Sequence, residues 1–187
     1  MITVDALWYL SRGTGVVGLI LLTTVVVLGV GNRSGRPVFG LPRFGVSVVH
    51  RNAALTALVL IAIHVTTLLF DPYAQLRLVD LVVPFTGTYR PLWLGLGTLA
   101  SDLFLALLVT SLLRHRIGLR GWRLVHWLAY LAWPVALLHG LGTGTDARTS
   151  WLRAIAVACG AAALAAVAWR CSAGFVERAN PSWAGRR

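Results

Sequence analysis

Five apolar stretches, each long enough to cross a lipid bilayer, constrain the fold of this chain more than any other feature. A transmembrane helix needs about 20 predominantly apolar residues, at a rise of about 1.5 Å per residue. Three of the stretches carry no charge, 13–32, 52–70 and 124–145, and a fourth, 91–113, carries only Asp102. The fifth, 154–169, is short but extends backwards past Arg153 through Leu152 and Trp151. We therefore predict an all-α fold with one domain over residues 1–187, an integral membrane bundle of five transmembrane helices at about 8–31, 46–70, 91–113, 122–141 and 151–170.

The composition excludes an ordinary soluble protein. Hydrophobic residues make up 57% of the chain and charged residues 12%, and soluble domains carry about 25% charged residues. The net charge of +11 comes from 17 basic residues, all of them arginine and placed between the apolar stretches. Basic loops of a membrane protein explain this charge, so we expect membrane lipid and no nucleic acid as a partner.

The arginines also predict the orientation of the helices. The segments 31–51 and 114–123 each carry four arginines and no acidic residue, and the segment from Arg170 onward has a net charge of +3. By contrast, Asp5 cancels Arg12 at the N-terminus, and the two acidic residues of 71–90 cancel its two arginines. The positive-inside rule therefore places the N-terminus outside, the C-terminus in the cytoplasm, and the protein in the plasma membrane as a multi-pass protein.

Four histidines lie inside the predicted spans, where hydrocarbon offers an ionisable group no solvation. His50 and His64 lie in the second helix at a spacing of fourteen positions, and His126 and His139 lie in the fourth at a spacing of thirteen. These two helices run in the same direction, so the histidines form one pair in each leaflet, separated by roughly 20 Å along the helix axis. Interhelical hydrogen bonding is the alternative role for any single histidine of this kind.

Paired imidazoles at one depth can take both axial positions of a haem iron, and two such pairs make a two-step path for electrons. A single transition-metal centre fits poorly, because the pairs are too far apart for one ion. The helical phase agrees for the second helix, since a spacing of fourteen positions is close to four turns. A spacing of thirteen is about 3.6 turns, so we expect Pro134 to kink or rewind the fourth helix.

These residues resemble the ferric reductase-like transmembrane domain family, whose members include NADPH oxidases, ferric-chelate reductases and the haem-binding membrane subunit of a periplasmic methionine sulfoxide reductase. The matching features are the two histidine spacings, the segment WRLVHWLAYLAWPVALLHG at 122–140 and LSRGTG at 10–15. They cover about residues 7–141. The resemblance implies two stacked b-type haems, an inner one ligated by His50 and His126 and an outer one ligated by His64 and His139.

The resemblance also implies electron transfer from a cytoplasmic or quinol donor to an acceptor outside, such as ferric iron, oxygen or a partner reductase. Unlike the oxidases, this chain has only 17 residues after Arg170, too few for a flavin and nicotinamide domain. We therefore expect a separate donor, either a flavoprotein or a quinol. The alternative function is a non-catalytic haem carrier or sensor, which double axial ligation disfavours.

Cationic partners for the haem propionates are expected from Arg51 and Arg123 at the inner haem and from Arg12 at the outer one. The alternative role of each is an arginine that anchors its helix at the membrane interface. Asp102, inside the third helix, is a candidate partner for an arginine or a ligating imidazole.

Overall fold

The structure is a computed structural model of the chain, and it describes residues 2–35, 37–38, 40–72, 74, 76–143 and 149–176. Within these residues, six α-helices and one short 3-10 helix follow each other. They are α1 (Ile2–Ser34), α2 (Arg43–Leu69), η1 (Leu78–Leu81), α3 (Pro91–Leu112), α4 (Arg114–His126), α5 (Ala129–Thr143) and α6 (Ser150–Cys171). These described ranges contain no β-strand, so the predicted all-α class is confirmed.

Four of the helices, α1, α2, α3 and α6, are long and apolar enough to cross a membrane. A fifth span is present if α4 and α5 are taken together, although they meet at a bend of 46°. The chain is therefore a multi-pass membrane protein, with four or five candidate spans among the residues that the structure describes.

The segment predicted as one helix over 122–141 is broken at Trp127 and Leu128. The break lies upstream of Pro134, which is inside α5. The break arises from backbone hydrogen bonds that span three residues, where a regular α-helix spans four. The N–H groups of Leu128, Tyr130 and Leu131 each donate to the carbonyl three residues earlier. Such bonds wind the chain at about 3 residues per turn in place of 3.6.

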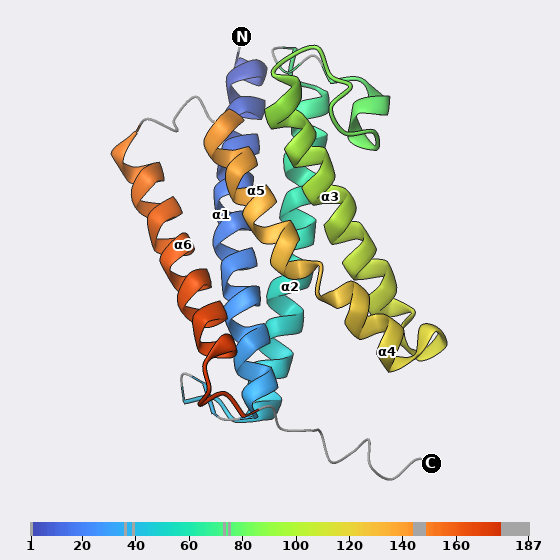
Figure 1. Cartoon of the computed structure of the whole chain (residues 1–187). Coiled ribbons are helices and arrows are strands. Elements are labelled where there is room, and N and C mark those ends of the chain that lie inside the picture. The colour runs from blue at the N-terminus through green and yellow to red at the C-terminus, as the bar shows by residue number, and fades with distance from the viewer. Residues whose placement is uncertain are drawn as a thin grey trace.

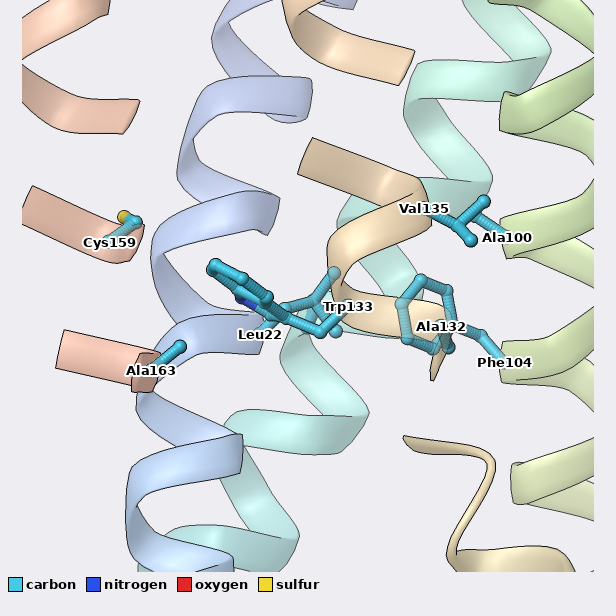
Figure 2. Packing of buried hydrophobic residues seen from close by; sticks show 9 residues of the cluster. Leu22, Ala100, Phe104, Ala132, Trp133, Val135, Cys159 and Ala163 are labelled. Carbon is cyan, nitrogen blue, oxygen red and sulfur yellow. The ribbon is translucent and has the colours of Figure 1, made fainter. Parts of the chain in front are cut away.

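The helices pack as two pairs that meet at a small core. α1 lies along α2, α3 lies along α5, and α6 covers α1 on the opposite side from α2 (Figure 1). Figure 2 shows Trp133 of α5 directed toward α1, while Phe104 of α3 lies beside Ala132. The other buried members are mostly small residues, which allow the helices to approach closely.

The arginine-rich segments gather at one end of the bundle, which we call the arginine-rich end. α1 ends there with Arg33 in its last turn, α2 begins there at Arg43, and α6 ends there beside Arg170 (Figure 1). α4 also lies at this end. The loop with η1 lies at the opposite end, as the predicted topology requires of a loop with balanced charge.

The loop at the opposite end is held by a buried carboxylate. Asp80, which is only 4% exposed, accepts hydrogen bonds from the backbone and side chain of Arg77 and from the hydroxyl of Thr86. Its own carbonyl accepts from the hydroxyl of Thr98 in α3, at 2.7 Å. The hydrogen bonds from Arg77, followed by the one from Thr86, hold the pKa of Asp80 well below its usual range.

Candidate functional site

The four histidines of the spans form two pairs of facing imidazoles, as their depths in the sequence predict. The ring centroids of His50 and His126 are 6.5 Å apart, and those of His64 and His139 are 6.2 Å apart. The planes of the two rings cross at 64° in the first pair and at 85° in the second. The first pair is the nearer one to the arginine-rich end.

Three of the four rings are fixed through Nδ1. The Nδ1–H of His64 donates to the carbonyl oxygen of Ser11 at 2.6 Å, and that of His50 donates to Val25 at 3.0 Å. In the same way the Nδ1–H of His139 donates to the carbonyl of Trp93 at 2.8 Å. Because a carbonyl oxygen only accepts, Nδ1 carries the proton and Nε2 keeps its lone pair.

The separation of the rings suits a shared metal ion. With bonds of about 2 Å from metal to imidazole nitrogen, and about 1.2 Å from that nitrogen to the ring centre, two rings facing across one ion have centroids about 6.4 Å apart. The observed separations of 6.2 and 6.5 Å agree with this value. Within the described residues no group of three or more histidine, cysteine or carboxylate side chains gathers around one point. The donor set is therefore two imidazoles per site, which fits a haem iron, whose other four ligands come from the porphyrin.

Space for a large flat group is present at one of the pairs. A cavity of about 730 Å³ is lined by His64 and His139, and also by Gly15, Gly97 and Phe104. This volume lies within the range of about 300–1,000 Å³ found for cofactor and ligand sites. In the described part of the chain α2 packs on α1 and makes no comparable contact with α5. The rings of His64 in α2 and His139 in α5 therefore face each other across a space between these two helices. The residues present therefore fit a haem at this pair.

The tightened turn between α4 and α5 allows His126 and His139 to serve the same side of the bundle. On a regular helix their spacing of thirteen positions would put them on different faces. The hydrogen bonds that span only three residues, at Leu128, Tyr130 and Leu131, wind this part of the chain more tightly. The stretch from His126 to His139 therefore comes closer to four full turns. The rewinding expected from the sequence is thus present, although it lies ahead of Pro134.

The three arginines proposed as propionate partners have different surroundings. Arg12 lines the cavity at the pair of His64 and His139, and its guanidinium lies 4.2 Å from the ring centre of Trp8. Arg51 and Arg123 are both exposed, the first next to His50 and the second one turn before His126. Asp102 is half-buried in α3 and does not line the cavity.

Several features of the site have no obvious signal in the sequence. Ser11, Val25 and Trp93 accept the histidine hydrogen bonds through their backbone carbonyls. The identities of their side chains therefore do not predict this role. Trp122 stacks on His126 with ring centroids 4.8 Å apart, and the sequence alone does not indicate this contact. One signal was available for α1: Gly15 and Gly29 repeat the spacing of the two α2 histidines that they face.

Comparison with known proteins agrees with this geometry. Residues 14–137, about two thirds of the chain, match the model of a family described as "Ferric reductase like transmembrane component". The matched range includes three of the four histidines and ends two residues before His139. No curated protein and no solved structure shows a significant match to the chain.

Proposed function

Because the chain belongs to the ferric reductase-like transmembrane family, we propose that it is a b-type cytochrome with two haems that passes electrons across the plasma membrane. Electrons enter at the arginine-rich, cytoplasmic end from a flavoprotein or a quinol. They leave at the opposite end to an acceptor such as ferric iron, oxygen or a partner reductase. When bound, haem supplies the one-electron chemistry.

The observation that carries this proposal is the pairing of the imidazoles. His50 with His126, and His64 with His139, each present two facing rings at the separation expected for axial ligands of one iron. Their Nδ1–H groups donate to backbone carbonyls in three of four cases, which leaves the lone pair on Nε2 for a metal ion. The two imidazoles of each pair would hold one haem, and the bound haem would supply one-electron transfer to acceptors that do not bind its iron.

Two further groups of residues support the haems in this proposal. Arg12 at the outer cavity, and Arg51 and Arg123 at the inner pair, offer guanidinium groups to the propionates. The apolar helices around the cavity keep water away from the imidazoles, and a dry environment is one of the factors that set a haem's potential.

The donor is proposed to meet the protein at α4. This helix presents exposed arginines at positions 114, 116, 120 and 123 at the arginine-rich end, close in sequence to His126. Such a surface attracts an acidic flavoprotein and also anionic lipid headgroups. A quinol would instead arrive within the bilayer, with no dependence on these arginines.

Transfer across a sealed membrane tests the proposed function. Ferricyanide is trapped inside vesicles that contain the purified protein, and dithionite is added outside. We expect reduction of the trapped ferricyanide with the wild-type protein, and the rate of protein-free vesicles with His64→Ala. A wild-type protein that binds both haems but transfers no faster than empty vesicles would contradict the proposal. Rapid loss of haem to apomyoglobin would instead favour a haem carrier.

A further inference from the structure

One local arrangement recurs at three of the four histidines. The Nδ1–H donates to a backbone carbonyl of a neighbouring helix, and the ring lies against a glycine four residues after that carbonyl. We call this arrangement the carbonyl–glycine unit. Its three examples are Ser11 and Gly15 with His64, Val25 and Gly29 with His50, and Trp93 and Gly97 with His139.

In each unit the absence of a Cβ at the glycine gives the imidazole room to reach the carbonyl. In an α-helix the carbonyl of residue i accepts from the N–H of residue i+4, and every Cβ tilts toward the N-terminus of its helix. A side chain at i+4 therefore leans over the carbonyl that the imidazole must reach. A Cβ added at Gly97 would lie 2.5 Å from the ring of His139, one at Gly15 would lie 3.1 Å from His64, and one at Gly29 would lie 3.4 Å from His50.

Two contacts fix the register of α3 against the antiparallel segment formed by α4 and α5. Trp93 accepts from His139, and Trp122 donates from Nε1 to the hydroxyl of Ser111 at 3.2 Å. Between these contacts α3 advances by eighteen positions, from Trp93 to Ser111, while the facing segment goes back by seventeen, from His139 to Trp122. The two segments therefore stay in nearly constant register from one contact to the other.

This register puts His126 at the level of Ala106 in α3, and the residue four positions after Ala106 is Thr110. Thr110 differs from the three glycines because it has a Cβ in the place that the imidazole would need, and because its hydroxyl donates to the carbonyl of Ala106 at 2.7 Å. In keeping with this, the buried Nδ1 of His126 has no hydrogen-bond partner among the described residues. Stacking on Trp122 holds the ring from one face instead.

We propose that Gly15, Gly29 and Gly97 are positioning residues that make both outer ligands and one inner ligand strong donors, and that Thr110 leaves His126 the weak donor of the four. This inference rests on the proposed function, because it concerns how the two haems differ. A hydrogen bond from Nδ1–H to a carbonyl raises the basicity of the imidazole, which stabilises ferric iron and lowers the reduction potential. Giving His126 a carbonyl should therefore lower the potential of the inner haem alone.

Substitution of Thr110 tests this directly, with the purified protein followed by optical redox titration. The component lost in His64→Ala identifies the outer haem, and the remaining one is the inner haem. Thr110→Gly frees the Ala106 carbonyl and removes the Cβ, so we expect a lower inner potential and an unchanged outer one. Thr110→Ala frees the carbonyl but keeps the Cβ, so its shift should be smaller. An inner potential in Thr110→Gly that equals the wild-type value, or moves no more than in Thr110→Ala, would overturn the inference.

The glycines supply the converse test. Gly97→Ala should raise the potential of the outer haem or release it, and Gly29→Ala should have the weakest effect of the three, since its added Cβ has the most room. Gly13→Ala is the matched control, because a Cβ there meets nothing within 4 Å. If Gly97→Ala behaves like Gly13→Ala in a protein with two haems, the inference fails and the proposed function stands. A wild-type protein that does not bind two haems would overturn both.

Discussion

Trp133 of α5 donates from Nε1 to the hydroxyl oxygen of Thr23 in α1 at 3.0 Å, and the bond is buried. It joins two helices whose residues are 110 positions apart in the sequence. The Thr23 hydroxyl in turn donates to the carbonyl of Leu19 at 2.8 Å, so both ends of the link are satisfied. This bond lies in the core between the depths of the two histidine pairs.

Removal of this link should destabilise the bundle modestly. Trp133→Phe keeps most of the ring and loses the donor, and a single hydrogen bond contributes about 1 kcal/mol. The midpoint of thermal denaturation in detergent should fall by about 2–4 °C for a chain of this size. Thr23→Val should have a similar effect, and the double variant should lose little more than either single one. Fully additive losses would show that the two side chains do not interact.

The loop at the opposite end should respond to pH through Asp80. Because the pKa of Asp80 is depressed in the folded protein, the stabilisation is complete above the unfolded value of about 3.9 and is lost as the pH falls through the folded value. At pH 7, Asp80→Asn should increase protease cleavage within 71–90 several-fold. In strong acid the wild type and the variant should be cleaved alike. Equal cleavage at pH 7 would show that the carboxylate does not hold the loop.

The orientation can be tested with the cysteines. Cys171 is exposed at the end of α6, at the arginine-rich end, whereas Cys159 is buried. A membrane-impermeant maleimide should therefore label Cys171 only after cells are permeabilised. Thr88→Cys in a Cys171→Ser background is the control, because Thr88 is exposed in the loop at the other end and should be labelled in intact cells. The reverse pattern would invert the topology and exchange the inner and outer haems.

The arginines of α4 should control reduction by an acidic flavoprotein. In stopped flow, Arg116→Gln combined with Arg120→Gln should slow haem reduction several-fold at low salt and weaken its salt dependence. Arg153→Gln is the matched control, since Arg153 is an exposed arginine in the first turn of α6, away from the arginine-rich end. Reduction that is insensitive to salt would remove the docking role, and these arginines would then serve topology and lipid contact.

The sequence predicted the four unbroken spans α1, α2, α3 and α6, and it predicted the pairing of His50 with His126 and of His64 with His139. Long apolar stretches and intramembrane histidines are strong signals because hydrocarbon tolerates few alternatives. The break at Trp127 could not be foreseen, since a tightened turn depends on backbone hydrogen bonds and has no residue signature of its own. Pro134 predicted a distortion in the correct segment, but the distortion lies about two turns earlier than Pro134.

The backbone acceptors were missed for a related reason. Every residue has a carbonyl group, so only the packing of α1 on α2 reveals that Ser11 and Val25 serve the imidazoles. The glycines of the carbonyl–glycine units, by contrast, are visible in the sequence. Gly15 and Gly29 have the same spacing as the two histidines of α2, and an antiparallel packing of the two helices brings the two spacings into register.

The haem content of single histidine variants tests the ligand assignment most directly. Pyridine haemochrome measurements on the purified protein should give about two haems per chain for the wild type, as for His115→Ala, whose histidine is exposed in α4. His64→Ala and His139→Ala should each bind about one haem, because each removes an axial ligand of the outer site only. Retention of both haems in either of these variants, or fewer than two in the wild type, would contradict the assignment.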